Sequence, residues 1–73
     1  MLKIYPNPTN GLLYVSSSIL VDVTILTMDG KVIQLVENAE MIDLTDVANG
    51  IYLASISDKD GEFLKMERIV VSR

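Results

Sequence analysis

Residues 21–37 read Val-Asp-Val-Thr-Ile-Leu-Thr-Met-Asp-Gly-Lys-Val-Ile-Gln-Leu-Val-Glu, and this stretch decides the fold. Its first five residues alternate between β-branched apolar and polar side chains, the period of a strand with one buried and one wetter face. A second apolar run follows at Val32–Val36. Asp29-Gly30 lies between the two runs and supplies the positive φ angles of a two-residue type I′ turn. The stretch therefore predicts an antiparallel β-hairpin.

Similar short runs continue in both directions, separated by Gly, Asn, Asp or Pro at intervals of about ten residues, which is typical of an all-β sandwich or barrel. Helical periodicity is weak throughout. We expect about seven strands, at Leu2–Tyr5, Leu12–Ser16, Val21–Met28, Lys31–Val36, Met41–Leu44, Ile51–Ser57 and Glu62–Ser72.

The connections and faces of these strands can also be anticipated. A second hairpin should close over Asp58–Gly61, with Gly61 in the left-handed position of a longer loop. Thr45–Gly50 should form a single helical turn or a bend. The continuous apolar run Ile69–Val71 indicates a strand that is buried on both sides or inserted between neighbours. In the preceding strand one face should carry Tyr52, Ala54 and Ile56, and the other Ile51, Leu53 and Ser55.

Composition limits what this chain can do. Its 73 residues are enough for one hydrophobic core, and 49% of them are hydrophobic, so we expect a single folded domain. The absence of cysteine excludes disulfides and thiolate metal sites, and the absence of histidine removes the commonest general base and metal ligand. The net charge of −4 opposes nucleic-acid binding, and no apolar run approaches the length of a membrane-spanning helix.

Candidate catalytic and metal-binding groups have simpler explanations. Ser16–Ser18 has no histidine to activate a serine, and a polar bend accounts for it. Asp58-Lys59-Asp60-Gly61 resembles the opening of a calcium loop, but the later ligands are missing. The carboxylates of Asp43 and Asp46 stand beside turn residues, where Asp is common. We therefore expect no enzyme activity, no metal and no cofactor.

Two further motifs have structural roles of their own. Tyr5-Pro6-Asn7-Pro8 contains two prolines, which lack backbone donors, so this segment cannot be a central strand and should blunt an edge. In Gly50-Ile51-Tyr52 the glycine turns the chain, and the tyrosine ring should pack while its hydroxyl finds a partner.

Taken together and in order, the motifs resemble a known family over essentially the whole chain. Tyr5-Pro6-Asn7-Pro8 with Gly11, then Gly30-Lys31, Ile42-Asp43-Leu44-Thr45, Gly50-Ile51-Tyr52 and a closing Arg68-Ile69-Val70-Val71-Ser72-Arg73 are similar to the type A C-terminal sorting domain of the type IX secretion system, the Por secretion tail family.

The resemblance implies an immunoglobulin-like antiparallel β-sandwich at the C-terminus of a cargo protein. Such a cargo crosses the inner membrane on its own signal and folds in the periplasm. The domain then directs it through the outer-membrane translocon, with the help of shuttle proteins, to the cell surface or the medium. A sortase-like cysteine protease usually removes the domain. In this interpretation residues 1–73 are one sorting domain, a fragment of a longer secreted protein, with Met1 as its initiator methionine.

The resemblance also assigns roles to residues. The positions associated with sorting are Arg68, Ile69, Val70, Val71 and Arg73. The signature positions, mainly structural, are Pro6, Asn7, Pro8, Gly11, Gly30, Lys31, Gly50 and Tyr52. The chain departs from the family at Thr27, where Asp is common, and at the two arginines, where Lys is common.

One hypothesis and two alternatives complete the interpretation. A terminal strand without a shielding segment would present unpaired backbone groups, as in recognition by strand addition. The first alternative is a small β-sandwich adhesion or carbohydrate-binding module of a surface protein, which the shortage of aromatic residues disfavours. The second alternative is a structural cap or spacer. Fold alone does not separate these functions.

Overall fold

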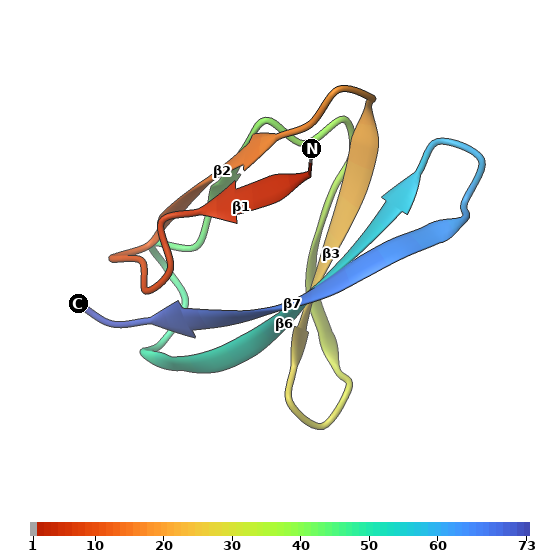
Figure 1. Cartoon of the computed structure of the whole chain (residues 1–73). Coiled ribbons are helices and arrows are strands. Elements are labelled where there is room, and N and C mark those ends of the chain that lie inside the picture. Colours follow the sequence, from red (N-terminus) through yellow and green to blue (C-terminus); the bar gives the residue numbers. More distant parts are fainter. Residues whose placement is uncertain (1) are drawn as a thin grey trace.

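Seven β-strands make up the computed structural model, which describes residues 2–73. They are β1 (Lys3–Tyr5), β2 (Leu12–Ser16), β3 (Val21–Thr27), β4 (Val32–Val36), β5 (Met41–Asp43), β6 (Gly50–Asp58) and β7 (Phe63–Val71) (Figure 1). The predicted strands are confirmed, with ends that differ by one residue in most cases. Met1, the expected initiator methionine, lies outside the described residues.

The strands form two antiparallel sheets. The smaller sheet has the order β1-β2-β5 and the larger one the order β4-β3-β6-β7. All three pairings in the larger sheet are antiparallel, and β6 with β7 forms its longest hairpin. The chain is therefore the immunoglobulin-like β-sandwich that the resemblance implied.

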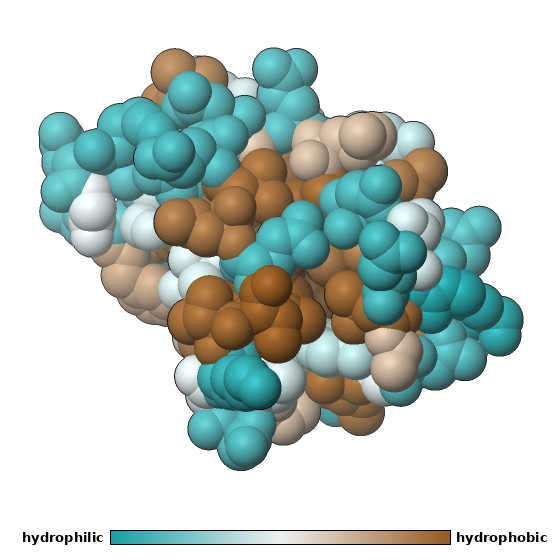
Figure 2. Space-filling view, turned by 180° about the vertical axis from the view of Figure 1, so that it is seen from behind, coloured by the Kyte–Doolittle hydropathy of each residue, from teal (hydrophilic) through white to brown (hydrophobic). Residues whose placement is uncertain are grey.

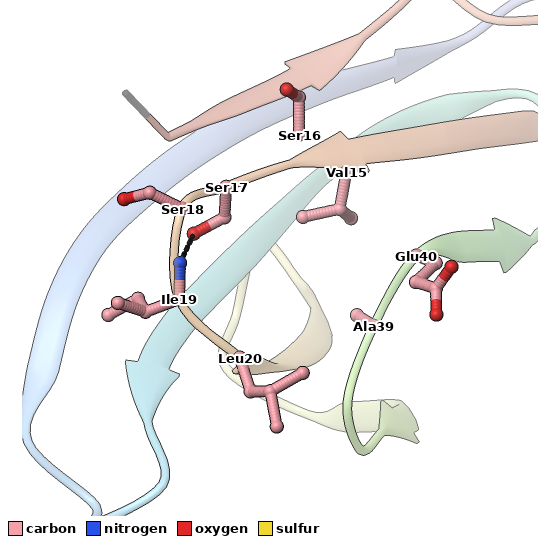
Figure 3. A pocket seen from close by; sticks show the side chains of 8 residues that line it. All are labelled: Val15, Ser16, Ser17, Ser18, Ile19, Leu20, Ala39 and Glu40. Atoms are coloured by element: carbon pink, nitrogen blue, oxygen red, sulfur yellow. Dashed lines mark hydrogen bonds between the residues drawn. The ribbon is translucent and has the colours of Figure 1, made fainter.

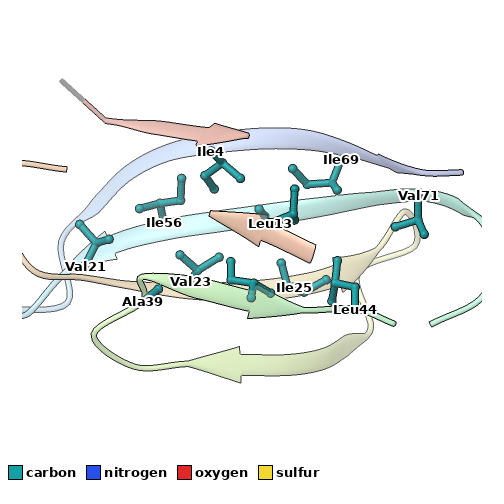
Figure 4. Close-up of a cluster of buried hydrophobic side chains, with 12 residues drawn as sticks. Ile4, Leu13, Val21, Val23, Ile25, Ala39, Leu44, Ile56, Ile69 and Val71 are labelled. Carbon is teal, nitrogen blue, oxygen red and sulfur yellow. The ribbon is translucent and has the colours of Figure 1, made fainter. Parts of the chain in front are cut away.

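The core lies between the two sheets, as Figure 4 shows. In β3 the alternation predicted from the sequence is confirmed, because Val21, Val23 and Ile25 are buried while Asp22 and Thr24 are partly exposed. The expected faces of β6 are confirmed in the same way. Burial of one such aliphatic side chain stabilises the fold by about 1.5–3 kcal/mol. The buried residues are Ile4, Leu13, Val21, Val23, Ile25, Ala39, Ile42, Leu44, Ala54, Ile56, Ile69 and Val71.

The β3–β4 connection is a hairpin, but the expected two-residue type I′ turn is wrong. The Thr27 N–H donates to the Lys31 carbonyl at 2.8 Å, and the Gly30 N–H donates to the Thr27 carbonyl at 3.0 Å, so three residues lie within the closing bond. A type I′ turn needs positive φ at both central residues, and of Asp29 and Gly30 only Gly30 has it, at 94°. The Thr27 hydroxyl favours the longer loop, because it accepts the Lys31 N–H at 3.0 Å.

The β6–β7 hairpin is built on the same plan. The Asp58 N–H donates to the Glu62 carbonyl at 3.0 Å, and Gly61 has a φ of 87°, which confirms its predicted left-handed position. An Asp58 carboxylate oxygen accepts the N–H groups of Asp60 and Glu62, both at 2.9 Å. Thr27 therefore holds the position in the first hairpin that Asp58 holds in the second, three residues before the glycine, and its hydroxyl makes the equivalent bond to the backbone.

The segment between β5 and β6 contains one hydrogen-bonded turn at Thr45–Asp46, followed by bends, and no helix. The Val47 N–H donates to the Leu44 carbonyl at 3.0 Å. At the start of the bend, an Asp43 carboxylate oxygen accepts both the N–H of Thr45, at 2.9 Å, and its hydroxyl, at 2.6 Å. These two bonds lower the pKa of Asp43 below its ordinary value of 3.8, the hydroxyl having the larger effect.

Candidate functional site

The end of β7 carries the residues that the resemblance associates with sorting, and strand alternation divides them between two faces. Ile69 and Val71 point into the core and are 0% and 1% exposed (Figure 4). Arg68 is exposed and pairs across the sheet with Leu53, while Val70 is partly exposed and pairs with Ile51. These residues therefore do not form one surface. Ile69 and Val71 hold the strand, and Arg68 and Val70 face outward.

The outer edge of β7 is covered at this end by the segment after β1. The Asn7 side-chain amide donates to the Arg68 carbonyl at 2.6 Å, and its oxygen accepts the Val70 N–H at 3.0 Å. The Thr9 N–H donates to the Val70 carbonyl at 2.9 Å, and the Ser72 N–H donates to the Thr9 carbonyl at 2.8 Å. We call this segment, Asn7–Thr9, the edge clamp.

The edge clamp changes the strand-addition hypothesis. The hypothesis assumed that Arg68–Arg73 has no shielding segment, and this assumption is wrong because four outward backbone groups of residues 68–72 already have partners within the chain. It also refines the prediction for Ile69–Val71. At this end β7 lies between β6 and a parallel bridge from Thr9 to Val71, so the apolar run is inserted between neighbours.

Thr9 is the buried anchor of the edge clamp, with 2% of its surface exposed. Its hydroxyl donates to the Leu12 carbonyl at 2.5 Å and accepts the Gly11 N–H at 3.0 Å. A hydrogen-bonded hydroxyl can be buried at little cost, whereas an unpaired one cannot. The sequence interpretation missed Thr9. A buried threonine directly after two prolines has no signal that distinguishes it from a surface residue.

Arg73 links the end of the chain to the bend between β5 and β6. Its guanidinium donates to the Leu44 carbonyl at 2.7 Å, the Thr45 carbonyl at 2.8 Å and the Asn49 side-chain oxygen at 2.9 Å. Its backbone N–H also donates to the Asn49 side chain, at 3.2 Å. An ammonium group cannot span three acceptors with the same planar fork, so Arg in place of the common Lys gives this chain a wider set of bonds.

The bend Leu44–Asn49 is held by further signature positions. The Leu44 N–H donates to the Gly11 carbonyl at 2.7 Å, and a Cβ at Gly11 would lie 3.0 Å from the Thr45 methyl carbon and 3.2 Å from its Cα. Only glycine allows this approach. The Tyr52 hydroxyl donates to the Ala48 carbonyl at 2.6 Å while its ring packs on the core, as predicted. Signature positions far apart in the sequence therefore meet at one end of the sandwich (Figure 1).

The remaining signature positions play local roles. Pro6 and Pro8 stand on either side of Asn7, and both prolines follow cis peptide bonds. Because β1 ends at Tyr5, directly before Pro6, the predicted blunting of an edge strand is confirmed. Lys31 takes part in the β3–β4 hairpin through its backbone, and its side chain makes no hydrogen bond or ion pair with residues 2–73. Gly50 is the first residue of β6.

A further group of polar side chains lies beside the β2–β3 connection. A shallow hollow of about 450 Å³ is lined by the end of β2, the β2–β3 connection, Ala39 and Glu40 (Figure 3). There the Ser17 hydroxyl oxygen accepts the Ile19 N–H at 3.2 Å, which agrees with the predicted polar bend. Within residues 2–73, no three His, Cys, Asp or Glu side chains lie close enough together to hold a metal ion. The same residues contain no helix long and apolar enough to cross a membrane.

Comparison with known proteins agrees with this geometry. A search among curated proteins finds no match. A family model described as secretion system C-terminal sorting domain matches residues 3–72, nearly the whole chain. Domains of this family serve as type IX secretion signals attached to an N-terminal cargo, and they act with the secretion machinery in export to the cell surface or medium. The chain belongs to the family of secretion system C-terminal sorting domains.

Proposed function

We propose that this domain is bound by the type IX translocon and its shuttle proteins after its cargo has entered the periplasm, and that a sortase-like cysteine protease then separates it from the cargo. The observation that carries the proposal is the family match over residues 3–72. In this role the domain is a ligand and a substrate, and no residue of it is catalytic.

The packing supports two different roles for the residues at the end of the chain, one structural and one in recognition. Ile69, Val71 and Arg73 are engaged inside the domain, by burial or by hydrogen bonds, so their contribution to sorting is to keep the strand in place. Arg68 and Val70 face outward and remain available to a partner. We therefore assign direct recognition to the outward residues of β7.

A fusion experiment tests the proposal. A periplasmically targeted reporter is joined to the N-terminus of residues 1–73 and expressed in a type IX host with and without its translocon. Export to the surface or medium should require the translocon, and export that continues without it would refute the proposal. In a host that lacks the sortase-like protease, the exported fusion should keep the mass of the uncleaved chain. Cleavage that persists there would remove the protease from the proposal.

One observation favours the carbohydrate-binding alternative enough to test it. Tyr5, Tyr14 and Met41 form a row across the outer face of the smaller sheet, with the tyrosine ring centroids 5.9 Å apart. Exposed aromatic side chains can stack on sugar rings. A bound soluble oligosaccharide should change the tyrosine fluorescence of the wild type and not of Tyr14→Ala, and a wild-type signal that stays constant excludes this function.

A further inference from the structure

The outer face of the larger sheet carries apolar side chains in rows that run across its strands. One row is Val32, Leu26, Leu53 and Arg68, which are cross-strand partners from β4 to β7. The next row is Leu35, Thr24, Ser55 and Met66, and a shorter one pairs Ile51 with Val70. We call these ten residues the outer sheet face.

Much of this apolar surface is open to solvent. Val32 is 55% exposed, Leu35 61%, Met66 48% and Ile51 45%. Hydrophobic residues also reach the surface on the side of the molecule seen from behind, where they lie across the middle of the view (Figure 2). Scattered apolar residues on a surface need no explanation, but an unbroken apolar run across three neighbouring strands, Val32, Leu26 and Leu53, is typical of an interaction site.

The charge on this face is opposite to that of the chain. The chain has ten acidic residues and a net charge of −4, yet none of the ten residues of the outer sheet face is acidic. Asp22 lies at the sheet end beyond it and is neutralised by Lys59, whose Nζ is 2.7 Å from an Asp22 oxygen. The one charged group of the face is Arg68, and its guanidinium makes no ion pair or hydrogen bond with residues 2–73.

Arg68 is held in position for contact. The edge clamp fixes its backbone, because Asn7 donates to the Arg68 carbonyl at 2.6 Å, and β6 fixes the opposite side of the strand through the pairing with Leu53. A guanidinium among apolar neighbours can bind a carboxylate with two parallel hydrogen bonds, and such a pair is stronger once water is excluded. Arginine is also one of the residues most often found as a hot spot, a residue that contributes much of the binding energy of a protein interface.

We propose that the outer sheet face is the surface on which this domain docks against a folded protein, whose matching patch is apolar and presents a carboxylate to Arg68. The inference rests on the proposed sorting function, since the partner would belong to the secretion machinery. Two other occupants fit less well. A second copy would place Arg68 against a face without acidic residues. An anionic membrane surface is bound by clusters of basic residues, whereas this face has one in a chain of net charge −4.

Charge reversal at Arg68 tests the contact in the reporter fusion. Arg68→Glu should lower translocon-dependent export at least about tenfold, because a carboxylate would then face a carboxylate. Lys31→Glu makes the same change in charge in the β3–β4 hairpin, beyond the outer sheet face, and should export like the wild type. Both variants should unfold at the same temperature as the wild type, since neither side chain makes a hydrogen bond or an ion pair with residues 2–73. Normal export of Arg68→Glu would overturn the proposal.

A second pair of variants tests the apolar part. Leu35 on this face and Leu20 in the β2–β3 connection are both 61% exposed. Leu35→Ser should reduce export several-fold and Leu20→Ser should not. Equal effects of the two changes on export would show that the apolar residues of the outer sheet face do not take part in recognition.

A cross-linking measurement separates failure of this inference from failure of the sorting proposal. A photoreactive phenylalanine analogue at position 55, in the middle of the face, should form an adduct with another protein in exporting cells, and Arg68→Glu should abolish the adduct. The same analogue at position 14, on the other sheet, should form none. If export is independent of the translocon, the sorting proposal fails, and the adduct at position 55 still decides whether the face docks a protein. An adduct with a second copy of the chain, or none at all, refutes the docking.

Discussion

At Asn7 a side-chain amide takes the place of a strand partner. Its nitrogen donates to the Arg68 carbonyl and its oxygen accepts the Val70 N–H, so one residue satisfies two backbone groups of β7. Asn7→Ala should lower the free energy of unfolding by about 1–3 kcal/mol, because each net hydrogen bond contributes about 0.5–1.5 kcal/mol. Urea unfolding measures this. Asn10→Ala, a change in the same loop at a side chain without hydrogen bonds in the described residues, should leave stability unchanged. Equal stability of the two variants would contradict the role given to Asn7.

Asp43 makes the stability of the bend depend on pH. Hydrogen bonds from Thr45 lower its pKa in the folded state, so its contribution to stability is present above the ordinary value of 3.8 and is lost as the pH falls through the lower, folded-state pKa. Asp22 acts in the same direction, chiefly through its hydrogen bond from Lys59. Asp43→Asn should therefore be less stable than the wild type at pH 7, and the difference should shrink toward pH 2. Thermal unfolding across this range checks the sign, and a difference that grows in acid would refute it.

At the scale of one element, the β3–β4 hairpin depends on the backbone of Gly30. Its φ of 94° is unfavourable for a residue with a Cβ, although no atom lies within 4 Å of where that Cβ would be. Gly30→Ala should therefore destabilise the domain by about 1–2 kcal/mol through backbone strain alone. Asn tolerates positive φ better than Ala, so Gly30→Asn should lose less stability. Urea unfolding of the two variants tests the order, and equal losses would show that strain at Gly30 does not limit the hairpin.

The elements also show where prediction from the sequence succeeds. The positions of all seven strands follow from apolar runs with a period of two and from the Gly and Asp residues between them, because these signals are local. The length of the β3–β4 turn did not follow. The Asp29-Gly30 pair indicates a two-residue loop, but the Thr27 hydroxyl and its bond to the Lys31 N–H stabilise a three-residue one.

At the scale of the whole molecule, the candidate site depends on contacts that no local pattern reveals. Asn7 meets β7 across 61 residues of sequence, and Arg73 meets Leu44 across 29. The resemblance identified both positions but does not indicate the bonds that they make. Arg73 is bonded to the bend, and its expected part in recognition stays a prediction. The outer sheet face is a further case. Its rows form only when four strands pair in register. The sequence contains ten acidic residues, and it does not indicate that none of them lies on this face.

Because the end of β7 is packed into the domain, a C-terminal truncation would affect the fold as well as recognition. Removal of residues 69–73 would take Ile69 and Val71 out of the core, together with the Arg73 bonds that hold the bend. Loss of one large aliphatic side chain from a core costs about 2–5 kcal/mol, and small domains are stable by only about 5–15 kcal/mol. The five-residue truncation should therefore abolish cooperative unfolding, as measured by circular dichroism during heating. Removal of Ser72 and Arg73 alone should lower the melting temperature but preserve the transition, because the buried part of β7 stays. A cooperative transition in the five-residue truncation would show that this strand is not needed for the fold. Loss of export could then be attributed directly to recognition of the missing residues.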